Sequence, residues 1–265
     1  MKKLVTFAGV LLCCVSSFAI TGKEVVDKYF SENPAPAFSR TEFKVESFRN
    51  GKIEDSITLV QFGRNKNELT ETVFEVTKNP GLKGTRFLQS QKKNTADARW
   101  IFTPALKTVR KIGSQDGAKS FVGTEFTYND TALRETDKDN HSLISENQDI
   151  TVGSASYNCY VVKSDPKSKR NIEFDYRIQY FDKDTYIPVK IEYFDKSGKL
   201  VKKMEVTKLE PLVGATGKKH NLRRVAEITN MLTGRRSVLT ILSMELDKEL
   251  KATYFSQNWL STGKS

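Results

Sequence analysis

Residues 86–133 read RFLQSQKKNTADARWIFTPALKTVRKIGSQDGAKSFVGTEFTYNDTAL, and this stretch decides the fold of the chain. Its first part alternates apolar and polar residues, which is the pattern of a strand with one buried face. A turn at 94–97 and a corner at 103–105 separate two further short strands, the second ending at Ile112. The part from Ser120 to Asp130 is rich in aromatic residues but does not alternate. It therefore needs a concave apolar surface to fill.

This block also resembles the signature of a known family. The run W-I-F-T-P-A-L-K-x-V-R-K-I, followed by S-F-V-G-T-E-F-T-Y-N-D, is similar to the pattern of the LolA-like outer-membrane lipoprotein-sorting proteins. In that family a Trp-aromatic-Pro-Ala-Leu segment and a basic run precede Ser-Phe-Met-Gly-Ser and an aromatic-acid pair. Here Val122 replaces the usual Met and Thr124 the usual Ser. The resemblance is most specific in this block. The family's succession of strands extends over nearly the whole mature chain.

The N-terminus has the three features of a secretory signal peptide. Lys2 and Lys3 form a short positive region, and residues 4–15 form an apolar stretch too short to span a bilayer. Ser17 and Ala19 supply small residues at the two positions that determine cleavage. The sequence therefore predicts export to the periplasm and cleavage after Ala19.

Cleavage at that point defines the domain organisation. It leaves residues 20–265, which we expect to form one domain, since all-β domains commonly reach this size. Lipid attachment at Cys13 or Cys14 is the less favoured alternative, because neither cysteine follows a small residue. Cys159 is then the only thiol of the mature chain, so no internal disulfide can form. Its strand-like, apolar setting favours a buried small hydrophobe over a reactive thiol.

The chain is strongly basic, with a formal net charge of +11. Removing Lys2 and Lys3 leaves 41 basic against 32 acidic residues, or +9. Such a charge attracts an exported protein to anionic lipid headgroups, acidic partners or polyanionic glycans. The charges are scattered along strands and turns, so a solvated, aggregation-resistant exterior is the alternative. No nucleic-acid-binding motif is present, and we expect no nucleic-acid partner.

One amphipathic helix is predicted near the start of the mature chain. Thr21 and Glu24 have capping-box spacing, Val25 and Tyr29 lie on one apolar face, and Pro34 ends the helix. That face can pack on a sheet or cover the mouth of a cavity. In the resembled family such a helix packs against the concave side of the sheet.

Strands with period two fill most of the remaining chain. Asn50-Gly51 is a strong hairpin signal, and Pro188 marks an edge or bulge position. The clearest run places Ile172, Phe174, Tyr176, Ile178 and Tyr180 on one face, which we expect to point toward the core. A last helical turn is expected at 254–260. The predicted strands outside the central block are 39–49, 53–62, 68–77, 84–90, 141–150, 172–180, 186–194, 199–209, 223–230 and 235–242.

So many antiparallel strands must close into a barrel or curl around something. We predict a mainly β (α+β) fold: a strongly curved antiparallel sheet forming an unclosed β-barrel of LolA/LolB type. The N-terminal helix and short helical segments would plug its concave face. From the residues alone, the aromatic interior can be a solid core or a ligand cavity. The resemblance favours a cavity that takes acyl chains.

The sequence offers little for catalysis. His141 and His220 lack metal-ligand spacing with another His or Cys, and no G-x-S-x-G elbow occurs. The glycine-containing run 113–117 lacks the Lys-Ser/Thr of a phosphate loop. We therefore expect no enzymatic activity, no metal and no cofactor.

We predict a periplasmic carrier or chaperone that binds acyl chains of lipoproteins or other lipids for transfer toward the outer membrane. It would act as a monomer with transient membrane contact. The resemblance implies an inner-membrane transporter of the RND or ABC type as a partner. The alternative is an adhesin-like, polyanion-binding protein with a basic exterior and a solid core. Residues predicted to line or gate the acyl-chain cavity are Trp100, Phe102, Leu106, Phe121 and Phe126, and those predicted to contact headgroups or a partner are Lys107, Arg110 and Lys111.

Overall fold

The structure is a computed structural model that describes residues 19–264. The predicted signal peptide, with Cys13 and Cys14, lies outside the described residues except for Ala19. The described helices are α1 (Gly22–Glu32) and α2 (Gln257–Thr262), and the strands are β1 (Phe38–Arg49), β2 (Lys52–Lys66), β3 (Leu69–Lys78), β4 (Arg86–Lys92), β5 (Ala98–Thr103), β6 (Thr108–Ile112), β7 (Asp139–Val152), β8 (Ala155–Pro166), β9 (Tyr176–Asp182), β10 (Pro188–Phe194), β11 (Leu200–Val213), β12 (Lys219–Asn230) and β13 (Arg236–Leu246).

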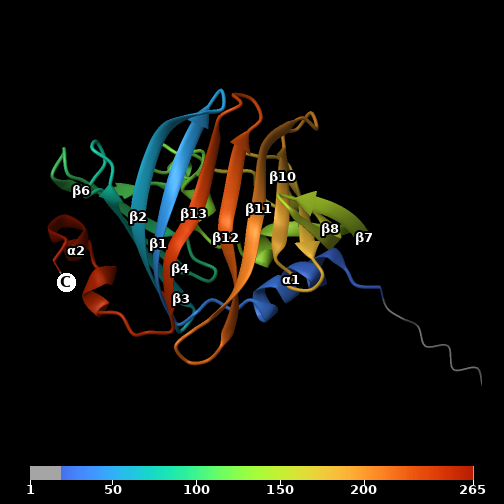
Figure 1. Cartoon of the computed structure of the whole chain (residues 1–265), viewed down its shortest axis with the longest axis horizontal. Coiled ribbons are helices and arrows are strands. Elements are labelled where there is room, and N and C mark those ends of the chain that lie inside the picture. Colours follow the sequence, from blue (N-terminus) through green and yellow to red (C-terminus); the bar gives the residue numbers. More distant parts are fainter. Residues whose placement is uncertain (1–18, 265) are drawn as a thin grey trace, which may run out of the picture.

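All thirteen strands belong to one antiparallel sheet (Figure 1). Its order is β6-β5-β4-β3-β2-β1-β13-β12-β11-β10-β9-β8-β7, so eleven of the twelve pairings join strands consecutive in the chain. The exception is β1 with β13, which joins two meanders at the middle of the sheet. Among the described residues β6 and β7 do not pair, and the sheet stays open between them. The predicted unclosed barrel is confirmed.

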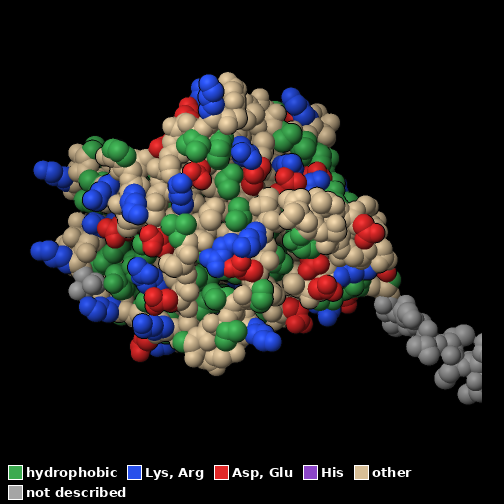
Figure 2. Space-filling view, in the orientation of Figure 1, with side chains coloured by type: hydrophobic (Ala, Val, Ile, Leu, Met, Phe, Trp, Pro, Cys, Tyr) green, Lys and Arg blue, Asp and Glu red, His purple; other side chains and the backbone are tan. Residues whose placement is uncertain are grey.

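The alternation of β1 shows how the sequence assigns its two faces. Thr41, Phe43 and Val45 are buried on the concave side. Lys44 and Glu46 alternate with this set on the convex side and form an ion pair of 2.6 Å. Over β1, β13, β12 and β11 the convex face carries basic and acidic side chains interspersed (Figure 2). This face is solvated and has no patch of a single sign.

The aromatic part of the central block lies inside the curve of the sheet. Residues 113–138, which we call the crossing segment, run from edge strand β6 to edge strand β7 through three short 3-10 turns. Phe121 sits edge-to-face against Phe74 at 5.2 Å and Phe87 at 5.3 Å between ring centroids. The concave surface that the sequence required is therefore supplied by β3 and β4.

Helix α1 packs against the other end of the concave side. Its capping box is present: the Glu24 amide donates to Thr21 Oγ1 at 3.2 Å, and the Thr21 amide donates to the Glu24 carboxylate at 2.7 Å. Val25 is buried in a cluster with Phe181 of β9. At Gly22 an added Cβ would lie 2.7 Å from a backbone atom of β7, so only glycine permits this close approach.

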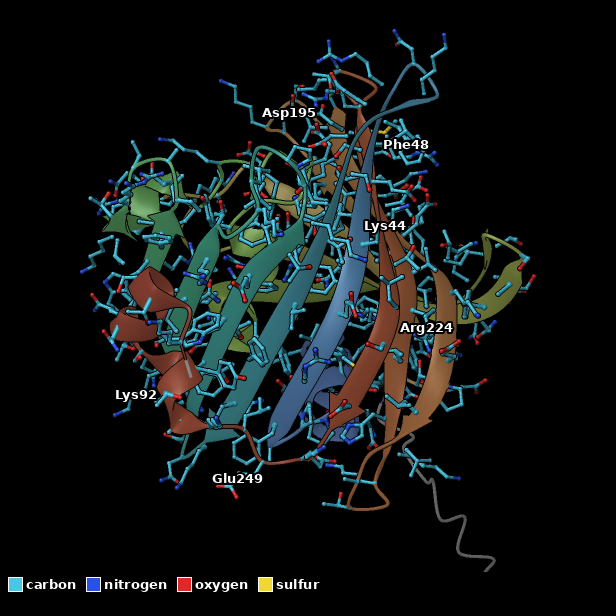
Figure 3. All side chains as sticks on the ribbon, turned by 60° about the vertical axis from the view of Figure 1, so that its left-hand side comes forward. Lys44, Phe48, Lys92, Asp195, Arg224 and Glu249 are labelled. Carbon is cyan, nitrogen blue, oxygen red and sulfur yellow. The ribbon has the colours of Figure 1, made fainter. Side chains whose placement is uncertain are left out.

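Helix α2 covers the outer face of the sheet instead. Trp259 and Leu260 are buried against Phe62 and Leu88, and Tyr254 stacks on Phe62 with ring centroids 4.1 Å apart. In Figure 3 this C-terminal helix lies outside the sheet, on the same side as the labelled Lys44 and Arg224. The molecule thus has apolar packing on both sides of β2–β5.

The structure corrects the prediction for residues 172–180. Strand β9 begins only at Tyr176, and its Arg177 and Gln179 point to the concave side. Tyr176 stacks on Phe194 at 4.9 Å, and the Tyr180 hydroxyl donates to Glu192 at 3.0 Å. Because tyrosine combines an apolar ring with a polar tip, it suits this half-exposed outer face. The predicted core face was therefore wrong for Tyr176 and Tyr180, whereas Phe174 is buried in a core cluster and Ile172 packs against that cluster.

Candidate functional site

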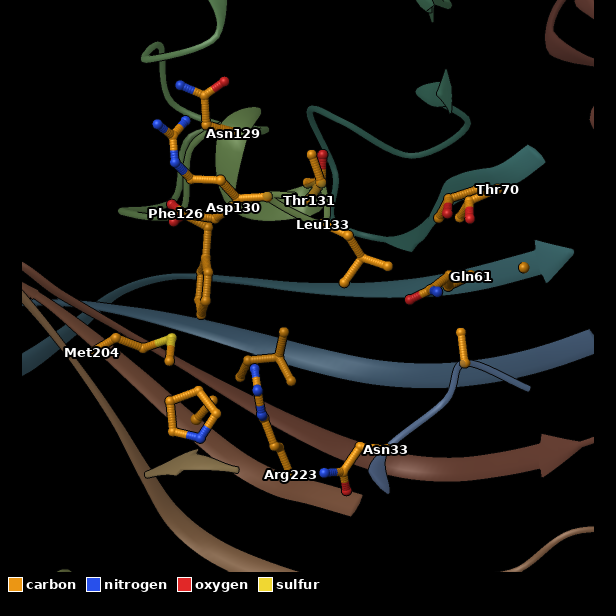
Figure 4. Close-up of a pocket in the computed structure, with 18 of the residues that line it drawn as sticks. Asn33, Gln61, Thr70, Phe126, Asn129, Asp130, Thr131, Leu133, Met204 and Arg223 are labelled. Atoms are coloured by element: carbon orange, nitrogen blue, oxygen red, sulfur yellow. The ribbon is translucent and has the colours of Figure 1, made fainter. Parts of the chain in front are cut away.

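A cavity of about 750 Å³ lies between the concave face, the crossing segment and the end of α1 (Figure 4). Known ligand pockets have volumes of ~300–1,000 Å³. The cavity opens where α1 ends, beside the start of β12 and the β4–β5 hairpin. The interior of this curved sheet is therefore hollow and reachable.

One end of the cavity is apolar. The walls of this end come from β1–β3, β13 and the crossing segment. The aromatic residues of the crossing segment cover the side opposite the sheet. The side chains that form this apolar end are Phe43, Val45, Ile57, Leu59, Phe74, Phe121, Phe126, Leu239 and Ile241.

The other end is polar because of the strand register. A cross-strand row runs over five strands through Ser39, Gly63, Thr72, Gln89 and Arg99. Partners in such a row share one face of a sheet, so the row forms a polar ledge nearer the mouth. A cavity with this gradient can hold a molecule that is polar at one end only.

Thr41 lies at the border between the two ends. It pairs across the strands with Gln61, and both line the cavity. The Thr41 hydroxyl is buried and has no hydrogen-bond partner among the described residues. An unmet buried hydroxyl costs free energy, so a bound group that meets it is favoured.

A buried lysine joins β11 to the crossing segment. Lys202 Nζ lies 2.7 Å from Asp130 and 3.1 Å from Glu173, and we call these three residues the lysine cluster. Burial opposes the charged lysine, but Asp130 and Glu173 outweigh burial and raise the pKa of Lys202. The cluster carries one more negative than positive charge.

A second cluster holds the end of the crossing segment to β9. The Asp139 carboxylate accepts from Arg134 Nε at 3.0 Å and from Arg177 at 3.0 Å, and we call these residues the arginine cluster. Burial favours the neutral carboxyl, but hydrogen bonds from Arg134 and the charge of Arg177 lower the pKa of Asp139. This cluster carries one more positive than negative charge.

Two further arginines reach the cavity. Arg99 donates to Asp97 and to Gln89 Oε1, both at 2.9 Å. Arg223 of β12 donates to the Tyr29 hydroxyl of α1 at 3.0 Å, and its guanidinium lies 5.4 Å from that ring's centroid.

The structure separates the five predicted cavity residues. Phe121 and Phe126 line the cavity. Trp100 and Phe102 do not, and instead pack on the convex face in the cluster that includes α2. The alternation of β5 sends Arg99 and Ile101 inward and their neighbours outward, which is the physical reason for this correction.

The remaining predicted positions lie near the β6 edge. Leu106 is 62% exposed in the β5–β6 turn, so it is not part of the cavity wall either. Lys107, Arg110 and Lys111 are exposed on this turn and on β6, and none forms an ion pair with a described residue. Their contact with headgroups or a partner stays a prediction.

The structure shows why sequence reasoning missed the buried charges. Arg177, Lys202 and Asp139 lie among many charged residues in strands and turns, and nothing local distinguishes them. Arg223 is followed directly by another arginine, Arg224. Only the bulge in β12 determines which of the two side chains points into the cavity. The one available signal was the alternation of β9, which assigns Arg177 and Gln179 a common face.

The two histidines and the cysteine of the described chain are hydrogen-bonded or buried. His141 Nδ1 lies 2.8 Å from Ser164 Oγ, but Ser164 is fully buried and its hydroxyl also donates to Gln179. His220 lies 3.2 Å from Asp247. Cys159 is buried, and burial raises the pKa of its thiol to about 12.

Residues 19–264 lack two kinds of feature. No group of three or more His, Cys, Asp or Glu residues there is placed to hold a metal ion. No helix in this range is both long and apolar enough to cross a membrane.

A family model described as "Uncharacterized protein" matches residues 68–262, well over half of the chain. No curated protein matches the chain.

Solved structures share the fold at low sequence identity. A putative outer membrane lipoprotein-sorting protein domain from Vibrio parahaemolyticus is 21% identical, with a TM-score of 0.80, covering 91% of this chain and 98% of that one. A DUF1329 family protein from Desulfovibrio piger is 19% identical, with a TM-score of 0.79, covering 90% and 97%. A LolA superfamily protein from Nitrosomonas europaea is 16% identical, with a TM-score of 0.65, covering 91% and 100%.

Proposed function

Because this chain belongs to the LolA-like protein family, we propose that it is a periplasmic carrier for the acyl chains of a lipoprotein or another lipid. One observation supports this most: the cavity of about 750 Å³ is apolar inside and polar toward its mouth. An adhesin-like protein with a solid core would have no use for such a space. Residues 20–265 act as one lipid-binding domain, exported by the signal peptide.

The mechanism is partition between water or membrane and the cavity. Each CH₂ group that enters the apolar end gains roughly 0.8 kcal/mol. Phe121 and Phe126 form the part of that wall contributed by the crossing segment. Because tight binding would trap the cargo, transfer toward the outer membrane requires an acceptor with higher affinity.

The basic residues at the β6 edge are the proposed contact with other components. Lys107, Arg110 and Lys111 are all exposed at this edge, with Arg110 on the face of Ile101 and Lys111 on the face of Trp100. Each suits anionic headgroups or an acidic surface on an inner-membrane transporter of the RND or ABC type. The contact with the membrane is transient and the carrier acts as a monomer. The LolA-like carrier fold is not that of an enzyme family, and we propose no catalytic role.

Filling the cavity is expected to abolish lipid uptake. Ala226 of β12 is 8% exposed and lines the cavity, so Ala226→Phe places a ring in the space that an acyl chain would occupy. The affinity for a fluorescent fatty acid should fall at least tenfold, while overpacking costs about 1–3 kcal/mol of stability. Fluorescence titration of the mature protein measures the affinity, and circular dichroism checks the fold.

A matched control lies next to it on the same strand. Val225 pairs with Thr240 on the outer face, so Val225→Phe adds a ring to the surface and should leave uptake unchanged. Equal uptake by Ala226→Phe and the wild type would show that the cavity is not the lipid site. Absence of any uptake, with salt-sensitive binding to a polyanion, would favour the adhesin-like alternative.

A further inference from the structure

The cavity contains one arginine that no carboxylate of the described residues neutralises. The arginines that line it are Arg99, Arg134, Arg177 and Arg223. Each of the first three has a carboxylate oxygen within 3.0 Å. Arg223 has no carboxylate within 4.0 Å among the described residues, and its guanidinium donates only to the Tyr29 hydroxyl. A cation in a confined site without a counter-ion favours the binding of an anion.

The other charges of the cavity cancel. The lysine cluster has one negative charge in excess and the arginine cluster one positive charge, so together they are neutral. At the exposed rim, Lys219 and Glu32 have opposite charges and no ion-pair partner among the described residues. The remaining charged lining residues are paired, as Arg99 with Asp97, Lys138 with Glu135, and Glu71 with Arg64. Arg223 is therefore the charge that remains.

A bulge in β12 aims this arginine into the cavity. The β11–β12 register shifts where Leu209 pairs with Arg223 and Lys208 with Val225, which leaves Arg224 as the extra residue. Arg224 forms an ion pair with Glu210 and donates to the Ile241 carbonyl at 2.9 Å. Arg223 instead extends into the pocket in Figure 4. Bulges commonly re-aim a side chain at a functional position.

An unsatisfied hydroxyl lies on the same border of the cavity. One strand, β13, lies between β12, which carries Arg223, and β1, which carries Thr41. The Thr41 hydroxyl is buried, lines the cavity and lacks a partner among the described residues. Beyond both residues the wall becomes apolar at Phe43 and Leu59.

We propose that the cargo is an amphiphile with an anionic head group, a carboxylate or a phosphate, bound at Arg223 with its acyl chain in the apolar end. This inference rests on the proposed function and adds the chemistry of the cargo's head. A guanidinium binds either head group through two parallel hydrogen bonds. The Thr41 hydroxyl donates to an oxygen farther along the same molecule. An uncharged ester or amide of the same chain length gains less from Arg223, because it offers only a neutral hydrogen-bond acceptor.

Two probes with the same tail separate the head from the chain. We would titrate mature protein with 11-(dansylamino)undecanoic acid and with its methyl ester, following dansyl fluorescence. The acid should bind about tenfold more tightly than the ester, since a hydrogen bond to a charged group contributes more than one to a neutral group. Added salt should weaken binding of the acid and leave the ester unchanged.

Three variants locate the effect. Arg223→Gln should weaken binding of the acid about tenfold and leave the affinity for the ester unchanged. Arg224→Gln is the matched control from the outer face and should change neither probe. Tyr29→Phe removes the hydroxyl that accepts a hydrogen bond from Arg223. This variant should bind the acid at least as tightly as the wild type does. If Arg223 served only to hold α1, Tyr29→Phe would weaken both probes as Arg223→Gln does.

Each remaining outcome has a definite meaning. Equal affinity of wild type for acid and ester overturns the anionic head group but leaves the carrier function standing. Binding of neither probe overturns the carrier function itself. Thermal stabilisation by inorganic phosphate alone, as large as that by the acid, would mean a site for a free anion and would overturn the amphiphile.

Discussion

Lys202→Met is expected to lower the free energy of unfolding by about 3–5 kcal/mol, because it leaves the carboxylates of Asp130 and Glu173 buried without their cation. The side chain of Lys202 is only 9% exposed, so water cannot replace the lost partner. The loss should also loosen the crossing segment, since Asp130 belongs to it. Urea denaturation at pH 7 measures the change.

The neighbouring residue provides the control. Lys203 pairs with Glu205 on the outer face, where both side chains are partly exposed, and Lys203→Met should cost less than about 1 kcal/mol. Adding Asp130→Asn and Glu173→Gln to Lys202→Met should recover part of the lost stability. A loss for Lys202→Met no larger than that for Lys203→Met would contradict a buried ionic cluster.

Asp139→Asn should produce a loss of similar size, about 3–5 kcal/mol at pH 7. The carboxylate of Asp139 is fully buried between Arg134 and Arg177, and the substitution leaves two guanidinium groups without a counter-charge. Asp165→Asn is the control, because Asp165 forms an exposed pair with Lys163 on neighbouring β8. Denaturant titration of both variants gives the comparison.

The same carboxyl gives a pH dependence with a defined sign. The pKa of Asp139 is lowered in the folded chain, so its contribution is complete above the unfolded pKa of about 3.9 and is lost as pH falls through the folded value. Wild-type stability should therefore fall more steeply below about pH 4 than that of Asp139→Asn. If the stabilities of the two proteins fell equally steeply below about pH 4, the lowered pKa of Asp139 would be refuted.

Local signals in the sequence were sufficient for most of the fold. The capping box of Thr21 and Glu24 formed as expected. Asn50 and Gly51 both have positive φ, as the predicted tight hairpin requires. The aromatic part of the crossing segment fills the concave side as expected, where Phe121 packs on Phe74 and Phe87. The capping box and the hairpin depend on residues close together in the chain, and the aromatic segment was recognisable from its composition.

The faces of individual strands were less predictable. Trp100 and Phe102 pack outside the sheet because the distant α2 provides a second apolar surface there. In β9 the tyrosines face outward, where the Tyr180 hydroxyl donates to Glu192 of β10 and Tyr176 stacks on Phe194. The inward position of Arg223 depends on a bulge, which a sequence pattern does not reveal. Site residues of this kind are set by tertiary neighbours.

The single pairing of β1 with β13 also governs the order in which the sheet can be completed. Ser39 pairs with Leu246, so β1 has no neighbour on that side until nearly the whole chain has been synthesised from its N-terminus. Until then β1 is an open edge, the kind of strand on which chains aggregate. Its outer face carries Arg40, Glu42, Lys44 and Glu46. In the finished molecule these charges are ordinary surface groups, but during folding they protect the one long edge that waits for its partner.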